Sequence, residues 1–158
     1  MAHLEQTTFI KVPVATLDGI VRDARRVPEY WVGMSAPLRA FGDGGPGSKA
    51  EFTLEMLGTH QRLIMRTTEE KHNSDGSTDW RWEYGGGMTG SLTCHHEPRE
   101  GGLEATTRFY YVLRGGMFGR LFDRAVLERR VRRDFEDSLE NLKLLAESSA
   151  AKPIAKAA

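Results

Sequence analysis

The sequence has little cysteine and no excess of either charge, and each shortage excludes a class of protein. Cys94 is the single cysteine among 158 residues, which excludes an internal disulfide and a cysteine zinc cluster. Acidic and basic residues balance at 22 each, so the chain as a whole has no electrostatic preference for nucleic acid or for an anionic membrane. The basic run Arg129–Arg133 is flanked by acidic residues and is typical of a solvated helix face. We therefore expect no nucleic-acid partner.

Long hydrophobic runs and known catalytic motifs are also missing. The start, Met1–Phe9, is polar without the apolar core of a signal peptide, and no run approaches the roughly 20 apolar residues that span a bilayer. We therefore expect a cytoplasmic protein without stable membrane insertion. No GxSxG nucleophile or zinc-binding spacing occurs, and the glycine-rich residues 42–47 lack the GK[ST] ending of a P-loop, so we predict neither a cofactor nor a metal. The length predicts one domain, residues 1–148, and the small, polar composition of residues 149–158 predicts a disordered tail.

Alternation of apolar and polar residues predicts a sheet. Turn-forming residues, such as those at 42–47 and 73–77, separate the alternating segments. Short intervals between strands favour a meandering antiparallel sheet with one apolar face. Seven segments are predicted as strands: residues 4–12, 37–41, 48–57, 60–70, 78–84, 88–96 and 103–113.

Three segments are predicted as helices. Residues 17–25, with Thr16 as N-cap, and residues 27–31 form two short ones between the first and second strands. The long one covers residues 117–147, where apolar residues recur at steps of three and four and would cover the apolar face of the sheet. Glu128 and Arg132 fall on its inward stripe, either as a solvated ion pair or as a polar feature of a cavity.

The order of these elements resembles the helix-grip fold of the START-like, Bet v 1-like superfamily, often called SRPBCC. Residues Phe9–Val14 look like its first strand running into a proline corner, and Ile20–Asp23 with Tyr30–Trp31 look like its helix pair. Residues Ser138–Lys143 are similar to its common helix terminus. The resemblance implies an α+β fold in which a curved, seven-stranded antiparallel sheet wraps around the long C-terminal helix. It also implies a deep apolar cavity between them.

Members of this superfamily bind or transport lipids, quinones, sterols and polyketides, and some are polyketide aromatase/cyclases. The resemblance therefore implies a carrier or binding protein for a hydrophobic small molecule, as a monomer or homodimer. The alternatives are a dehydratase-type polyketide cyclase and an interaction module whose filled core holds no ligand. The residues predicted to bind the ligand are Tyr30, Trp31, Leu54, Met56, Met65, Trp82, Tyr84, Phe109, Tyr111, Phe118, Leu121, Phe122, Ala125 and Phe135.

A cyclase would need acid/base groups in the same cavity. Arg108 or Arg132 would stabilise an enolate oxygen, while Tyr84 or Glu128 would move the proton. His95 and His96 are adjacent on a predicted strand and face opposite ways, so they cannot form a two-ligand metal site by themselves. Cys94 falls on the predicted inner face, where a buried and inert thiol is expected rather than a nucleophile.

Overall fold

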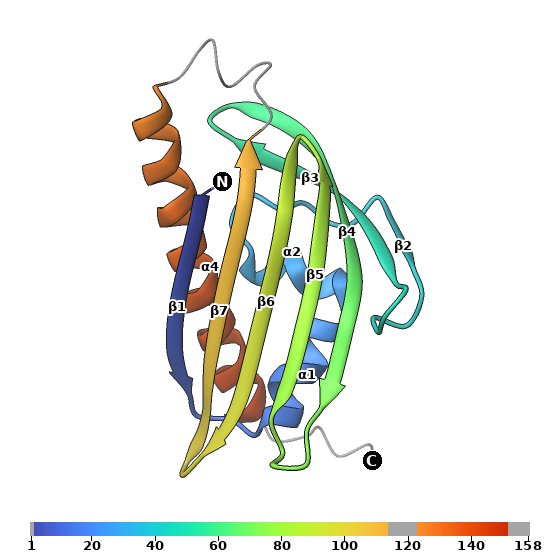
Figure 1. Ribbon diagram of the computed structural model, residues 1–158, viewed down its shortest axis with the longest axis vertical. Helices are drawn as coiled ribbons and strands as arrows, with labels where there is room; N and C mark the ends of the chain where they lie inside the picture. Colours follow the sequence, from blue (N-terminus) through green and yellow to red (C-terminus); the bar gives the residue numbers. More distant parts are fainter. Residues whose placement is uncertain (1, 114–122, 152–158) are drawn as a thin grey trace.

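The computed structural model describes residues 2–113 and 123–151, and it has the predicted helix-grip architecture (Figure 1). A curved antiparallel sheet lies in front of one long helix, and the short helices lie on the same side of the sheet as that helix. The elements are β1 (Ala2–Ile10), α1 (Val14–Arg22), the 3-10 turn η1 (Ala24–Arg26), α2 (Val27–Tyr30), β2 (Arg39–Phe41), β3 (Lys49–Met56), β4 (Thr59–His72), β5 (Thr78–Gly86), β6 (Met88–Arg99), β7 (Gly102–Leu113) and α4 (Arg124–Ala151).

The sheet has seven strands in the order β1-β7-β6-β5-β4-β3-β2. Strands β2 to β7 follow one another as neighbours, as the short turns predict, and β1 adds to the far edge beside β7. A bulge between Thr67 and Glu69 of β4 shifts the register, so that Glu70 pairs with Trp80. Residues opposite one another share a face, so the bulge turns Glu70 toward the concave side. The bulge therefore interrupts the alternation of β4 after Thr67.

Helix α4 covers the concave face with a single apolar stripe. Its buried residues are Leu127, Val131, Phe135, Ser138, Leu139, Leu142 and Ala146. The spacing of three and four confirms the helix predicted from the sequence. Ala125 is exposed because it lies off this stripe, so its assignment to the ligand site is wrong. Phe118, Leu121 and Phe122 lie outside the described residues.

The first short helix begins earlier than the sequence indicates, whereas the second begins at Val27, as predicted. Helix α1 begins at Val14 rather than Leu17, because Pro13 is the N-cap and its carbonyl accepts from the amide nitrogens of Thr16 and Leu17 at 3.0 and 3.4 Å. It ends at Arg22, where Asp23 accepts from the backbone N–H of Arg25 at 3.1 Å and so caps η1.

The C-terminal helix ends later than expected. It continues to Ala151, so the predicted disorder is wrong for residues 149–151, and residues 152–158 lie outside the described part. The side-chain hydroxyl of Ser148 donates to the carbonyl of Leu145 at 3.1 Å, which keeps this serine within the helix. No helix in the described ranges is long and apolar enough to cross a membrane.

Candidate ligand-binding site

Between the described parts of the sheet and α4 lie two small, largely apolar cavities. The first has a volume of about 30 Å³ and the second about 20 Å³. Each therefore has room for about one water molecule, which needs on the order of 10–15 Å³. The first is lined by Val21, Val27, Tyr30, Trp31, Met65, Trp82, Tyr84, Leu92, Cys94, Thr107, Leu139 and Leu142. The second is lined by Trp31, Val32, Leu54, Met56, Met88, Phe109, Val131, Asp134 and Phe135.

Aromatic side chains pack against one another between the described parts of the sheet and α4. Phe109 is at their centre: its ring stacks on Tyr111 and Phe135 with centroids 5.2 and 6.0 Å apart. It also makes edge contacts with Tyr84 at 6.3 Å and with Trp31 at 6.0 Å. Such pairs add roughly 0.5–1.5 kcal/mol each beyond the area they bury. The aromatic groups predicted as cavity walls thus pack against one another, and a ligand must displace some of them.

The hydroxyl groups of Tyr30 and Tyr84 are the most informative polar atoms of the first cavity. No described residue forms a hydrogen bond with either of them. No fully enclosed side-chain nitrogen or oxygen in the described ranges lacks a partner. Both tyrosines line the first cavity. Their hydroxyls are available to a water molecule or to a ligand.

Burial keeps these groups neutral. It raises the pKa of Tyr30 and of Tyr84 well above the ordinary value, and the nearby Cys94 thiol adds to both shifts. Burial also raises the pKa of Cys94 to about 12, although a contact of 3.6 Å with the Thr107 hydroxyl opposes the shift. At neutral pH the first cavity therefore presents hydrogen-bond donors, with neither a general base nor a thiolate. The thiol is buried, as the sequence predicts.

The residues predicted for proton transfer do not gather at one place. Arg108 lies on the outer face of the sheet and donates to Glu5 at 2.7 Å, because it alternates with the buried Thr107 and Phe109. Arg132 is exposed because it lies beside, rather than on, the apolar stripe of α4. The prediction that these two arginines face the cavity is therefore wrong.

Glu128 lies at the surface, whereas Tyr84 lines the first cavity. Glu128 accepts a hydrogen bond from Arg124 at 2.9 Å on the surface of α4, so its ion-pair partner is not Arg132. Its charge still adds to burial in raising the pKa of Tyr111. Among the four predicted catalytic residues, only Tyr84 lines one of these two cavities as described.

Most of the predicted ligand-binding residues do line the two cavities. Tyr111 is buried but lines neither. The sequence-based prediction missed seven residues of the first cavity: Val21, Val27, Leu92, Cys94, Thr107, Leu139 and Leu142. The strand alternation and the stripe of α4 place Leu92, Cys94, Leu139 and Leu142 on inner faces, but only packing shows that they border a void.

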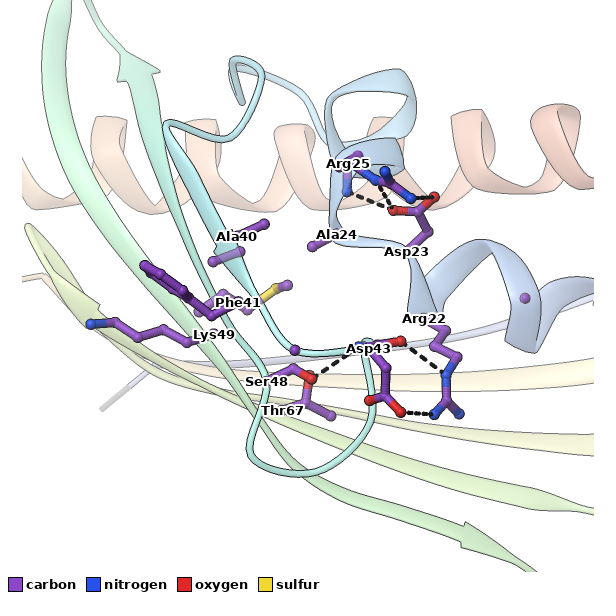
Figure 2. Close-up of a pocket in the computed structure, with 15 residues that line it drawn as sticks. Arg22, Asp23, Ala24, Arg25, Ala40, Phe41, Asp43, Ser48, Lys49 and Thr67 are labelled. Carbon is purple, nitrogen blue, oxygen red and sulfur yellow. Dashed lines mark hydrogen bonds and ion pairs between the residues drawn. The ribbon is translucent and has the colours of Figure 1, made fainter.

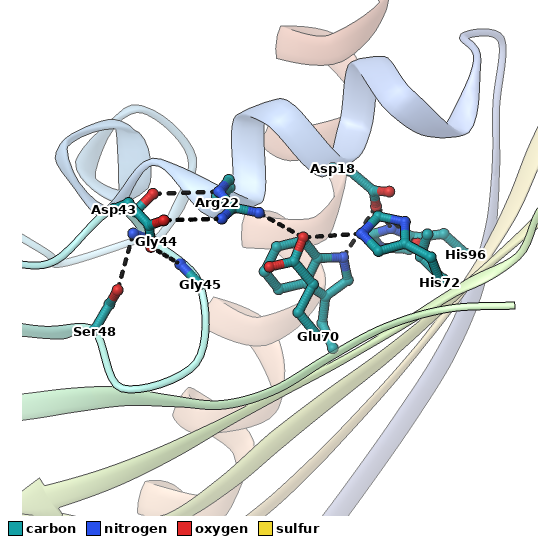
Figure 3. A network of polar contacts seen from close by, with 11 residues as sticks. Asp18, Arg22, Asp43, Gly44, Gly45, Ser48, Glu70, His72 and His96 are labelled. Atoms are coloured by element: carbon teal, nitrogen blue, oxygen red, sulfur yellow. Dashed lines mark hydrogen bonds and ion pairs between the residues drawn. The ribbon is translucent and has the colours of Figure 1, made fainter.

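Two larger and more open grooves flank α1, on either side of Arg22. One, of about 440 Å³, lies between α1, η1 and the β2–β3 region (Figure 2). The other, of about 400 Å³, lies between α1 and the ends of β4 and β5. Arg22 donates to the Asp43 carbonyl at 3.2 Å and pairs with Glu70, which also contacts His72 at 3.0 Å (Figure 3). The charges around Arg22 are therefore matched within the protein.

A buried polar cluster under α1 fixes this helix to the sheet. Oδ1 of Asp18 accepts from the Thr78 hydroxyl at 2.8 Å, from Nε1 of Trp80 at 3.0 Å and from Nδ1 of His96 at 2.8 Å (Figure 3). Burial alone would raise the pKa of Asp18, but the hydrogen bonds from His96, Thr78 and Trp80 outweigh it and lower the pKa. The sequence patterns did not predict a role for Asp18. An acidic residue on a short amphipathic helix gives no indication of burial.

The histidines of β6 face opposite ways, as predicted. His96 is buried against Asp18, whereas His95 lies on the outer face and contacts Asp79 at 2.6 Å. Within residues 2–113 and 123–151, no three metal-ligating side chains gather into a group. The described part of the chain thus offers no set of residues to hold a metal.

Comparison with known proteins identifies a matching family and several similar structures. A family model described as polyketide cyclase / dehydrase and lipid transport matches residues 1–147. The fold is similar to that of TTHA0849 from Thermus thermophilus, with a TM-score of 0.74 and 16% identity, covering 96% of this chain and 100% of that one. It is also similar to a START superfamily protein from Mycobacterium smegmatis, with a TM-score of 0.68 and 11% identity, covering 93% and 98%.

An enzyme is also among the similar structures. The Zhui aromatase/cyclase from Streptomyces has a TM-score of 0.67 and 15% identity, and the match covers 94% of this chain and 95% of that one. No curated protein matches the sequence. At these identities the likeness shows the fold alone.

Proposed function

The chain belongs to the polyketide cyclase/dehydrase and lipid-transport family, and we propose that it is a binding or carrier protein for a small, uncharged hydrophobic molecule held between the sheet and α4. The observation that carries the proposal is the pair of tyrosines, Tyr30 and Tyr84, which line the first cavity and whose hydroxyls have no described protein partner. A buried polar group without a partner costs roughly 1–3 kcal/mol. A ligand oxygen placed between the two hydroxyls would remove that cost.

The lining also indicates the chemistry of the ligand. The first cavity has no charged side chain among its described residues, so a charged ligand would lose its hydration without compensation. Neutral tyrosine hydroxyls suit a carbonyl, ether or hydroxyl oxygen as acceptor. The indole of Trp82 and the ring of Tyr84 offer flat apolar walls. A hydrophobic molecule with one polar oxygen fits this combination.

A cyclase is supported less well by the described residues. Proton transfer at neutral pH needs a group whose pKa lies near 7. The titratable groups of the first cavity all have raised pKa values and stay protonated. Asp134, which lines the second cavity, is held by Arg130 at 2.9 and 3.0 Å. The geometry therefore favours binding over catalysis.

A module with a filled core and no ligand is the other alternative. The small volumes of the two cavities agree with it. The hydroxyls of Tyr30 and Tyr84 argue against it, because a core that only has to be packed gains nothing from polar groups without partners. Phenylalanine would serve a filled core better at both positions.

Native mass spectrometry of the purified protein, followed by solvent extraction, tests the proposal. We expect a bound hydrophobic molecule, and the native mass also measures whether the protein is the predicted monomer or homodimer. A matched pair of variants makes the test specific. Leu139→Phe fills the wall of the first cavity, whereas Leu144→Phe adds the same ring at a position that is 55% exposed on the same helix.

We expect Leu139→Phe to purify with at least tenfold less bound molecule and Leu144→Phe to retain the wild-type amount. Circular dichroism checks that both variants fold. Equal amounts in the two variants would place the ligand elsewhere. A wild-type protein that carries nothing and binds no uncharged fluorescent probe would instead support the module without ligand.

A further inference from the structure

Trp31 has a position that no other described residue shares: it lines both cavities. It follows directly after α2, and its ring makes an edge contact with Phe109, with the centroids 6.0 Å apart. The first cavity, with Tyr30 and Tyr84, and the second cavity, with Leu54 and Met56, thus adjoin at Trp31.

Hydrogen bonds hold the backbone on both sides of Trp31. Its own N–H donates to the Val27 carbonyl at 2.8 Å, and Nδ2 of Asn141 donates to the Tyr30 carbonyl at 3.2 Å. The Val32 N–H donates to the Ser138 hydroxyl at 2.9 Å. Helix α4 therefore holds the chain immediately before and after Trp31. A conformational change at Trp31 would therefore involve its side chain and not its backbone.

The side chain itself is only partly buried. Trp31 packs against the core but keeps part of its surface exposed, unlike the other two tryptophans, which are buried. An indole at the boundary can change rotamer toward solvent without unfolding the sheet. Turning it outward would add the volume of the ring to the two voids that adjoin it.

We infer that Trp31 is the partition that sets the length of the ligand. With the indole turned inward, the site consists of two short voids. With the indole turned outward, they form one elongated site from Tyr84 to Phe135. This inference rests on the proposed function and names the ligand class more closely. It is an elongated, flat hydrophobic molecule whose single oxygen lies between Tyr30 and Tyr84 and whose apolar end reaches Leu54.

Two phenols of different length test the partition. One probe is 2-naphthol, which is short, and the other is trans-4-hydroxystilbene, which is elongated; both are fluorescent and uncharged. The variants are Trp31→Ala and, as the matched control, Trp82→Ala. The control removes the same side chain from the wall of the first cavity alone. Fluorescence titration gives the Kd of each probe.

Trp31→Ala is expected to lower the Kd of trans-4-hydroxystilbene at least tenfold relative to the wild type, and Trp82→Ala is expected to lower it less than threefold. Val131→Phe, placed in the second cavity, is expected to abolish the gain when combined with Trp31→Ala. If truncation to alanine prevents folding, Trp31→Phe is expected to give a gain of about threefold that Val131→Phe also abolishes.

The partition is refuted if Trp31→Ala binds the elongated probe no better than Trp82→Ala, or if the gain survives Val131→Phe. Failure of the proposed function gives a different pattern. In that case the wild type carries no molecule and binds neither probe, while Trp31→Ala still gains the elongated one. That pattern would leave the partition correct and the natural function elsewhere.

Discussion

Strand β5 contributes to two buried regions that differ in the hydrogen bonding of their polar groups. Its first half places Thr78 and Trp80 against Asp18, where each polar group has a partner. Its second half places Trp82 and Tyr84 beside the first cavity, where the Tyr84 hydroxyl has no described partner. Both regions lie on the concave face and under helices. Burial alone therefore does not distinguish an anchor from a binding site, whereas the state of the hydrogen bonds does.

The two regions differ because one contains a charged group and the other contains neutral groups. Asp18 is buried as a carboxylate, and only its three hydrogen bonds offset the loss of hydration. A tyrosine hydroxyl is neutral and loses far less when it lacks a partner. A tyrosine hydroxyl without a described partner, as at Tyr30 and Tyr84, is therefore tolerated more easily than an unpaired Asp18 carboxylate would be. Four changes challenge this contrast between the anchor and the cavity, and their expected effects decrease from the first to the last.

Removing the anchor should have the largest effect. Asp18→Ala leaves the donors of Thr78, Trp80 and His96 buried without their acceptor, and we expect the free energy of unfolding to fall by about 3 kcal/mol. Urea denaturation measures it. Asp23→Ala, which removes the cap of η1 and the ion pair with the exposed Arg25, is the control and should cost about 1 kcal/mol. Equal losses for the two variants would mean that the buried cluster is no anchor.

Burial of the cavity wall should protect its thiol. Cys94 is enclosed and its pKa is raised to about 12, so almost no thiolate is exposed to reagent at pH 8. We expect alkylation of the native protein to be at least a hundredfold slower than that of the protein in urea, which corresponds to about 2.7 kcal/mol of protection. Mass spectrometry follows the reaction. Rapid labelling of the native state would show that the first cavity is open to solvent.

Acid should weaken the anchor. The Asp18 pKa in the folded state lies below the value of 3.8 expected for the unfolded chain, so its contribution to stability is complete above that pH. The contribution is lost as the pH falls through the folded pKa. Asp18→Asn cannot titrate, and its free energy of unfolding should therefore depend less on pH below about 4 than that of the wild type. Parallel pH profiles for the two proteins would show that Asp18 does not contribute to acid sensitivity.

Removing a hydroxyl from the cavity should change stability least. Tyr84→Phe deletes a group without a described partner, so we expect the free energy of unfolding not to fall, and to rise by up to about 1 kcal/mol. The same change should weaken the binding of 2-naphthol about tenfold, because one hydrogen bond to the ligand is lost. Thermal denaturation and fluorescence titration measure the two effects. A destabilisation of about 2 kcal/mol would reveal a protein partner for this hydroxyl.

Much of the fold could be predicted from local patterns. Alternation placed Leu54, Met56, Trp82 and Phe109 on the concave face of the sheet. Steps of three and four placed Leu139 and Leu142 on the inner face of α4. The strand following Gly58 was less certain, because the bulge after Thr67 is set by pairing with β5 and not by its own sequence. Period and turn chemistry are local, whereas register depends on the neighbouring strand.

The site was harder to predict, for two physical reasons. Filling of the cavity depends on how rings such as Phe109 and Phe135 stack across the interior, which no pattern along the chain records. Asp18 meets its partners 60 to 78 positions further along the chain. Arg132 was predicted on the inward stripe of α4 but is exposed. A shift of one residue around a helix moves a side chain by 100° and so takes it out of the stripe.

The three tryptophans allow the contrast between anchor and cavity to be measured in one spectrum. Nε1–H of Trp80 is bonded to Asp18, whereas Trp31 and Trp82 line the first cavity. On titration with 2-naphthol followed by ¹H–¹⁵N NMR, we expect the indole signals of Trp31 and Trp82 to shift. The hydrogen exchange rate of the Trp80 indole should stay unchanged. Faster or slower exchange at Trp80, with no shift at Trp31 or Trp82, would contradict binding of the ligand between the sheet and α4.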